Sequence, residues 1–218
     1  LRPLGLRLQG VDVELATEAL RRMGYTAEFR DIVWENKDDY LEDGSVDCLW
    51  GSFSMNGRED NYTWAGPYLC SRQVVVTRVD SGIASLADLE GKRIAVQATG
   101  KAEGVLIHGN DPRIPEVAAV YCFSTMDEVY ASLRKNYVDA IAGHENALKA
   151  MMNDAPESFV MLPEALYVSQ LGVAFRKGTH EEPAAELAQT LDEMRADGTI
   201  AQILQKYDLD VNTALGVE

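Results

Sequence analysis

The sequence is poor in the residues that build metal centres, and it lacks a long apolar run. Its 218 residues include three cysteines and three histidines. No pair of cysteines has C-x-x-C spacing, so no compact zinc pattern can be assembled. No stretch approaches the roughly 20 consecutive apolar residues of a membrane-spanning helix, and the N-terminus lacks the charged-then-apolar pattern of a signal peptide. We expect no metal, no cofactor and a soluble piece of chain; the compartment stays open.

Basic residues are also scarce relative to acidic ones. Lys and Arg number 20 against 35 for Asp and Glu, a formal net charge of −15. A charge of this sign repels phosphate backbones, so nucleic acid is not an expected partner. Hydrophobic residues make up 46% of the chain, enough for a globular protein with a large core in one domain or two lobes.

The three cysteines, Cys48, Cys70 and Cys122, have two interpretations. If the domain is exported, Cys48 and Cys70 can form a disulfide. The simpler interpretation, which we favour, is that all three are small buried apolar side chains.

Helical and extended patterns alternate along the chain. Apolar residues recur at helical spacing over residues 10–23, and Gly24 then marks an end. Further helices are predicted over residues 34–41, 85–91, 101–108, 126–135 and 146–153, and two more near the C-terminus separate at Asp197-Gly198. Strands are predicted over residues 27–33, 46–53, 72–78, 93–97, 118–123, 138–142, 159–162 and 171–176. This order predicts an α/β fold with a parallel, doubly wound sheet. Because no Gly/Ser linker is present, two lobes would be joined by strands, which points to a hinge.

Several segments, in order and at matching spacing, resemble one known family. They are Gly10–Ala16, Gly44–Asp47, Ser52–Arg58, Ala65–Tyr68, Leu86–Lys92, Ile94–Gln97, Tyr137–Ala140, Glu193–Thr199 and Lys206-Tyr207. From about Gly10 to Tyr207 the chain is similar to the bacterial extracellular solute-binding proteins of family 3, which serve polar amino-acid uptake and have the type II periplasmic-binding fold.

The resemblance implies two α/β lobes, each a mostly parallel sheet flanked by helices, with a hinge of two strands. Lobe 1 would hold residues 1–76 plus 170–218 and lobe 2 residues 77–169, with crossovers near Val76 and Ser169 and the ligand in the cleft. The family's opening strand, with a ligand-stacking aromatic residue, should precede Gly10, and residues 1–9 are too few for the usual strand and loop.

Arg58 is the strongest candidate for a ligand contact. Its planar guanidinium can hold a carboxylate through two parallel hydrogen bonds, each worth about 1.5–3 kcal/mol. By composition alone it could be an ordinary surface arginine beside Glu59 and Asp60. The resemblance favours ligand binding, although the stretch from Ser52 to Arg58 is one residue shorter than in many relatives.

The resemblance also implies that Ser52 and Ser54 place a backbone carbonyl and a hydroxyl beside the ligand; a plain strand-end turn is the alternative. Thr99, Gly100 and Lys101 lie where a strand ends and a helix begins, and free N–H groups there form an anion site. The family often has a hydroxyl residue in place of Lys101. The lysine would add a cation for an acidic ligand or would be a solvated first-turn residue.

Amino-acid-binding relatives usually carry an aspartate, the partner of the ligand ammonium, at the position of His144. Glu145 could supply the charge instead, or His144 could indicate a ligand without an ammonium group. Among the aromatic residues, Phe53 and Trp64 are predicted to face the ligand, with core packing as the alternative.

The resemblance therefore implies a binding protein, not an enzyme, that captures a small carboxylate-bearing molecule, above all an amino acid, for ABC-type uptake. Its partners would be that molecule and a membrane permease. We expect an extracellular or periplasmic location with a membrane tether in the full-length protein, and a monomer as this fragment.

Two alternatives are kept. The first is a sensor domain attached to its own transmembrane signalling protein, a kinase or cyclase, which an apolar run of about 20 residues beyond Glu218 would indicate. The second is a dehydratase on the same fold, with Glu145 or His144 as the acid beside Arg58. No nucleophile, base and orienting group can be assigned from the sequence.

Overall fold

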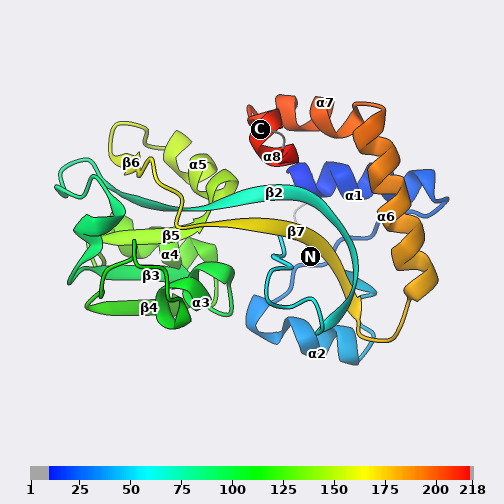
Figure 1. Cartoon of the computed structure of the whole chain (residues 1–218), viewed down its shortest axis with the longest axis horizontal. Helices are drawn as coiled ribbons and strands as arrows, with labels where there is room; N and C mark the ends of the chain where they lie inside the picture. The colour runs from blue at the N-terminus through cyan, green and yellow to red at the C-terminus, as the bar shows by residue number, and fades with distance from the viewer. Residues whose placement is uncertain (1–9, 217–218) are drawn as a thin grey trace, which may run out of the picture. The chain divides into compact units, whose positions relative to one another are not determined.

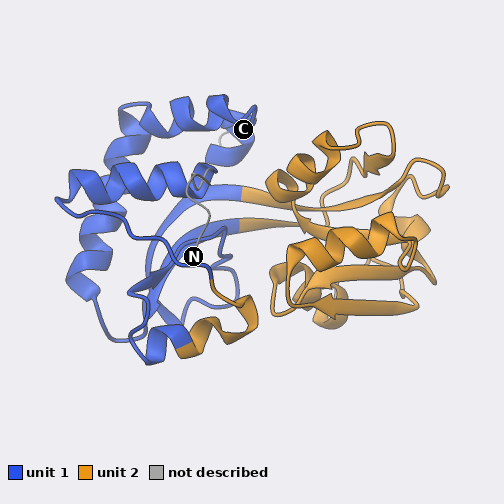
Figure 2. Ribbon diagram, turned by 180° about the vertical axis from the view of Figure 1, so that it is seen from behind, with its two compact units in different colours: residues 1–31, 40–70, 170–218 blue, residues 32–39, 71–169 orange. Residues whose placement is uncertain are grey.

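The computed structural model describes residues 10–216, and within them the chain divides into two compact units (Figure 2). Unit 1 takes in the described parts of Leu1–Asp31, Tyr40–Cys70 and Gln170–Glu218, and unit 2 takes in Ile32–Asp39 and Ser71–Ser169. Two of the boundaries fall inside long strands, β2 (Tyr62–Arg78) and β7 (Tyr167–Arg176). The lobe bounds inferred from the sequence stay a prediction.

The core of unit 1 is built from helices on a short sheet. Helix α1 (Val11–Arg22) packs against α6 (Glu181–Ala196) and α7 (Thr199–Lys206), and α7 contacts α8 (Val211–Leu215) (Figure 1). Strand β1 (Cys48–Leu49) pairs antiparallel with β7. Apolar side chains spaced three or four residues apart give each helix one buried face; they include Leu15, Ala19, Leu187, Leu191, Met194, Ile200 and Leu204.

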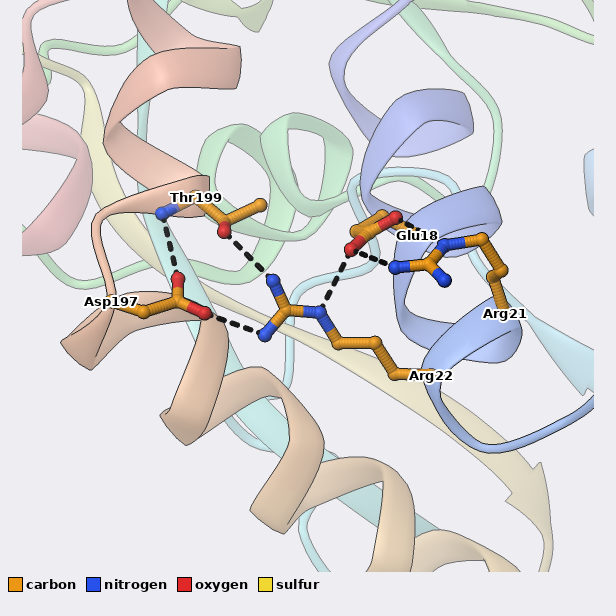
Figure 3. A network of polar contacts seen from close by, with 5 residues as sticks. All are labelled: Glu18, Arg21, Arg22, Asp197 and Thr199. Atoms are coloured by element: carbon orange, nitrogen blue, oxygen red, sulfur yellow. Dashed lines mark hydrogen bonds and ion pairs between the residues drawn. The ribbon is translucent and has the colours of Figure 1, made fainter.

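The end of α1 is joined to the turn between α6 and α7 by a polar network (Figure 3). Arg22 donates to Glu18 at 2.8 Å, to Asp197 at 2.6 Å and to the Thr199 hydroxyl at 2.9 Å. Hydrogen bonds from Arg21 and Arg22 lower the pKa of Glu18 to about 2. The network fixes two helix ends at the surface of unit 1.

Unit 2 contains the strands β3 (Arg93–Gln97), β4 (Ala119–Phe123), β5 (Ala140–His144) and β6 (Phe159–Met161). With β2 they run in the order β2-β5-β3-β4, and β6 pairs with β2. Helices α3 (Lys101–His108), α4 (Met126–Arg134) and α5 (Glu145–Asn153) follow β3, β4 and β5. Two single-turn 3₁₀ helices, η1 (Trp34–Asn36) and η2 (Leu86–Leu89), and the start of α2 (Lys37–Glu42) complete the unit.

The apolar core of unit 2 lies on both faces of its sheet. Val75 packs into the cluster on one face, and its neighbours Val74 and Val76 pack into the cluster on the other. This follows from the two-residue period of a strand, because successive side chains point to opposite faces. A strand buried on both sides therefore has the continuous apolar run seen in the sequence.

The fold class is α/β as predicted, and the sheet is mixed. Strand β3 is parallel to β4 and β5, whereas β2 is antiparallel to β5 and β6, and β1 is antiparallel to β7. Strictly parallel pairing was thus correct only where a helix connects successive strands. The chain reaches β3 from β2 through a 3₁₀ turn, so no crossover helix imposes a parallel direction.

Some predicted strand bounds are wrong. Residues 27–33 form no strand, and the strand predicted over 46–53 is limited to Cys48–Leu49. Strand β2 begins at Tyr62, upstream of the predicted Arg72, although Gly66 and Pro67 usually disfavour a strand. Strand bounds depend on which neighbouring strand is available for pairing. That information comes from the fold and not from the β-propensity of the local sequence.

Two compositional expectations can be compared with the structure. The cysteines form no disulfide. The expectation that all three are buried is wrong, because Cys48 and Cys70 are half-buried and Cys122 is exposed on edge strand β4. Burial raises the pKa of the Cys48 thiol to about 12, so the thiol stays protonated and is a poor nucleophile. Within residues 10–216, no helix has the length and apolar content to cross a bilayer.

Candidate functional site

One candidate site lies at the edge of the sheet in unit 2. The parallel strands β5, β3 and β4 end at this edge, and α5, α3 and α4 begin there (Figure 1). In the order β2-β5-β3-β4, the strands β5 and β3 are neighbours. From β3 the chain continues to β4 on one side, and from β5 it continues to β6, which pairs with β2 on the opposite side. Where connections diverge in this way, open α/β sheets bind small molecules. Residues 99–101 follow β3, and residues 144 and 145 join β5 to α5, so both predicted segments of unit 2 lie at the divergence.

The turn from β3 into α3 is shaped to receive an anion. Thr99 has a left-handed φ of 56°, and Gly100 is the N-cap of α3. A Cβ at Gly100 would come within 2.9 Å of the Gln97 carbonyl oxygen, so this turn requires glycine. The Thr99 N–H donates to the Glu103 carboxylate. This N–H is engaged by a carboxylate of the chain itself, so a ligand carboxylate would bind the remaining N–H groups of the helix start or displace Glu103.

Two lysines accompany this turn. Lys101 lies over the ring of Tyr167, with Nζ 4.5 Å from the ring centroid. Lys37 is buried, its Nζ lies 3.2 Å from the Thr99 hydroxyl oxygen, and it faces the ring of Trp34 at 5.4 Å. The sequence analysis missed Lys37, because nothing in the polar stretch around it distinguishes a buried lysine from a solvated one. A hydroxyl and an ammonium thus lie together beside the helix start.

His144 is surrounded by buried polar side chains of β2 and β7. It lies directly opposite Gln73 in the antiparallel pair of β2 and β5. Its ring nitrogens are 3.0 Å from the Ser71 hydroxyl oxygen and 3.0 Å from the Gln73 amide nitrogen, which also donates to Ser169 at 3.3 Å. Ser71 and Gln73 thus place a neutral hydroxyl and a neutral amide beside the position that carries aspartate in the resembling proteins.

Glu145, the first residue of α5, is bound to two cations. Its carboxylate lies 3.4 Å from an Arg72 guanidinium nitrogen and 2.8 Å from the Lys149 ammonium. Arg72 and Lys149 thus already balance the negative charge with which Glu145 would attract the ammonium group of a ligand. Its role as that partner stays a prediction.

In unit 1 the loop of residues 52–58 is joined to β7. The Met55 N–H donates to the Gln170 carbonyl at 2.8 Å, and the Gly172 N–H donates to the Phe53 carbonyl at 3.0 Å. A Cβ at Gly172 would lie 2.5 Å from the Met55 sulfur, so the loop packs closely on this glycine. The sheet thereby holds the loop from one side.

Arg58 ends this loop with its guanidinium turned back over it. Nη1 donates to the Ser54 carbonyl at 3.2 Å, and the guanidinium carbon lies 5.3 Å from the centroid of the Phe53 ring. The Arg58 carbonyl accepts from the Trp64 indole at 3.1 Å. Backbone and side chain of Arg58 are therefore both held, which orients the planar fork that could bind a carboxylate.

The two predicted aromatic residues lie in one cluster beneath Arg58. Phe53 packs on Trp64 and Tyr62, with ring centroids 5.1 Å and 5.3 Å away. Phe53 is only 2% exposed, and one of its faces carries the guanidinium. Phe53 therefore supports the guanidinium of Arg58. Direct stacking of Phe53 or Trp64 on a ligand stays a prediction.

Ser52 opens the loop in a left-handed conformation, with φ 53°. Its hydroxyl donates to Asp12 at 2.9 Å, and the other Asp12 oxygen accepts from the Tyr68 hydroxyl at 2.7 Å. Burial raises the pKa of Asp12 above its usual value, against the opposing effect of these hydrogen bonds. Since the Ser52 hydroxyl is engaged by Asp12, any ligand contact from Ser52 would come from its backbone.

The predicted residues thus form two groups. Unit 1 holds those of the loop and β2 together: Ser52, Phe53, Ser54, Arg58 and Trp64. Unit 2 holds those of the sheet edge together: Thr99, Gly100, Lys101, His144 and Glu145. The opening strand expected before Gly10 falls on residues 1–9, outside the described residues. Among those that are described, no three His, Cys, Asp or Glu side chains gather as metal ligands.

A mixed α/β sheet with a helix start at the point where its strand connections diverge is typical of proteins that bind small molecules there. A family model described as bacterial extracellular solute-binding proteins, family 3, matches residues 4–210. The chain therefore belongs to the bacterial extracellular solute-binding proteins of family 3.

Individual relatives cover most of the chain. It is 29% identical over 213 residues to the L-cystine-binding protein TcyA of Bacillus subtilis, covering 92% of this chain and 73% of that protein. It is 25% identical over 211 residues to the arginine-binding extracellular protein ArtP of the same species, covering 93% and 79%. Among solved structures, Tv2483 bound to L-arginine superposes with a TM-score of 0.82 at 28% identity, covering 92% of this chain and 82% of that one.

Proposed function

We propose that this chain captures a small amino acid through its carboxylate and delivers it to a membrane permease for ABC-type uptake. The observation that carries the proposal is the β3–α3 turn, where a helix begins at Gly100 and the Thr99 hydroxyl oxygen lies 3.2 Å from the Lys37 ammonium nitrogen. The guanidinium of Arg58, held over its loop in unit 1, is a second group suited to a carboxylate. The names of the relatives, which bind cystine and arginine, support an amino acid as the ligand.

A thermal-shift panel tests this proposal. A molecule that binds only the folded protein increases the free energy of unfolding by RT ln(1 + [L]/Kd), and so raises the Tm. L-cystine, L-arginine, L-histidine and L-glutamate are the probes, each compared with its decarboxylated amine where one exists. We expect at least one amino acid, and none of the amines, to raise Tm. No shift with any amino acid, confirmed by titration calorimetry, would reject the proposal.

We further propose that the chain is a binding protein without catalytic activity, placed outside the cytoplasm and tethered to the membrane in the full-length protein, and a monomer as this fragment. The family and the relatives, which are named as binding proteins, support this. Incubating pure protein with the bound amino acid and finding it chemically unchanged tests the first part. Cell fractionation of the full-length gene product and light scattering of the fragment test the other two.

The bridging of one ligand by both lobes, and closure about strands near Val76 and Ser169, remain predictions of the sequence. Small-angle scattering with and without the amino acid that binds best measures them, because closure lowers the radius of gyration. An unchanged radius, with full affinity in one isolated lobe, would contradict the hinge.

A further inference from the structure

A half-buried aspartate, Asp12, contacts the start of the loop of residues 52–58, and the proposed ligand chemistry does not use it. Asp12 lies in the first turn of α1, and its two oxygens accept from different segments of unit 1: the Ser52 hydroxyl at the start of the loop and the Tyr68 hydroxyl on β2. The partners are 40 and 56 positions away in the sequence. One carboxyl group thus joins a helix, a loop and a strand.

Stability alone does not account for a carboxyl group in this position. Taking a carboxylate out of water is unfavourable, as the raised pKa of Asp12 indicates, and apolar residues of similar volume often replace such a polar set without loss of stability. Tyr68 is itself 1% exposed, and burial and the adjacent Asp12 raise the pKa of its hydroxyl, so Tyr68 stays protonated and donates to the carboxylate. A polar group kept against such a penalty is suited to selecting one conformation among several.

The conformation in question is that of Ser52. With φ 53° it occupies the left-handed region, which a residue with a side chain seldom adopts without a local hydrogen bond. The backbone direction at Ser52 decides where Phe53, Ser54 and Arg58 go. An arginine whose guanidinium must meet a carboxylate is sensitive to such a change, since a misplacement of about 1 Å weakens an oriented contact strongly.

We propose that Asp12 is a positioning residue: through the hydroxyls of Ser52 and Tyr68 it holds Ser52 in the left-handed conformation and so presets the loop of residues 52–58 for ligand. The presetting of the loop stands on the geometry of unit 1 alone. Its consequence for affinity rests on the proposed function.

Amide hydrogen exchange without ligand tests the presetting. In Asp12→Ala we expect the Met55, Arg58 and Gly172 amides, whose bonds close the loop, to exchange at least about tenfold faster, while α6 amides keep their rate. Glu14→Ala is the matched control: it removes another carboxylate of α1, also bonded by a tyrosine hydroxyl, Tyr207 at 2.6 Å, but away from the loop. Unchanged loop amides, or equal acceleration throughout unit 1, would overturn the proposal.

Two further variants separate positioning from simple packing and remain useful if Asp12→Ala folds poorly. Asp12→Asn keeps an acceptor for Tyr68 and offers an amide to Ser52, so loop exchange should stay within about threefold of the parent. Adding Ser52→Gly to Asp12→Ala should slow the loop amides again, because glycine adopts positive φ without a side-chain anchor. A double variant as fast as the single one would mean that Asp12 does not act through Ser52.

Titration calorimetry of folded variants with L-cystine, L-arginine, L-histidine and L-glutamate then tests the consequence. We expect about tenfold weaker binding in Asp12→Ala than in Glu14→Ala or Asp12→Asn for whichever of these probes binds the parent. If the parent binds none of them, the proposed function fails while the exchange result still decides the role of Asp12. Equal affinity in Asp12→Ala and the parent would overturn the role of Asp12 in binding.

Discussion

The two groups of candidate site residues are positioned in different ways. In unit 2 the groups come from strand ends and helix starts, Thr99–Lys101 and His144–Glu145, whose place follows from the order of the strands. In unit 1 they come from a loop that backbone hydrogen bonds join to β7 and that a side chain 40 positions away, Asp12, contacts at Ser52. A site segment on regular structure is held by backbone hydrogen bonds, whereas a loop of this kind needs specific side chains to hold it.

Arg58→Ala should have the largest effect on binding. Charge-assisted hydrogen bonds to a carboxylate contribute about 1.5–3 kcal/mol each, so we expect about 100-fold weaker binding of the best amino acid in the panel. Stability should change little, because Arg58 is half-buried and its removal leaves the aromatic cluster beneath it in place.

Calorimetry and thermal melting measure the two effects separately. Arg176→Ala is the control, since Arg176 is an exposed arginine of the same unit, 3.0 Å from Glu42. If Arg58→Ala keeps its affinity within about threefold, a change under 1 kcal/mol, Arg58 does not bind the ligand carboxylate.

Gly100→Ala should come next, because it disturbs the unit 2 group through the backbone. The added Cβ would meet the Gln97 carbonyl oxygen at 2.9 Å, so the β3–α3 turn must shift. We expect a loss of about 1–3 kcal/mol in stability and about tenfold in affinity. Gly104→Ala, in the same helix with nothing within 4 Å of the new Cβ, should instead raise stability by up to about 1 kcal/mol. If both variants behave alike in urea unfolding and calorimetry, the turn is not a constrained anion site.

Glu145→Gln should have a smaller effect. Its charge is shared with Arg72 and Lys149, so its loss should weaken binding of a neutral amino acid by only about three- to tenfold. Lys149→Gln is the control, because it keeps the carboxylate and frees it from one cation. Thermal shifts with L-cystine and L-glutamate provide the readout. If neutral amino acids stabilise Glu145→Gln as well as the parent, Glu145 is not the ammonium partner.

The smallest effect should come from the surface network of unit 1 (Figure 3). The folded pKa of Glu18 is about 2 and its ordinary value is 4.5, so its stabilising contribution is present above pH 4.5 and is lost as pH falls from 4.5 toward 2. Because this pair lies at the surface, we expect less than about 1 kcal/mol.

Urea unfolding across that pH range, in the parent and in Glu18→Gln, measures the contribution. The difference between the two proteins should be present at pH 6 and mostly lost at pH 2. The stability of the parent relative to Asp12→Asn should change in the opposite direction. Because the pKa of Asp12 is raised in the folded state, its ionisation lowers the stability of the parent as pH rises above 3.8. Parallel curves for Glu18→Gln and the parent would show that the network adds nothing to stability.

Much of the unit 2 site could be predicted from the sequence. The bounds of β3 and α3 agree with those predicted, and the position of residues 99–101 at a helix start follows from them. The parallel direction of β5, β3 and β4 was also expected, because helices separate these strands in the sequence. Lys37 was missed, since its burial beside Thr99 comes from a segment 62 positions away.

The sequence by itself determined the alternation of strands and helices, the family, and the arginine loop as a candidate, because periodicity and motif spacing are local properties of the chain. Only the tertiary structure decided the antiparallel pairing of β2, the hydroxyl and amide beside His144, and the contact of Asp12 with Ser52 and Tyr68. Each of these depends on residues that are distant in sequence and adjacent in space. The free energy of a buried polar group is set by its partners, and the partners are known only when the chain is folded.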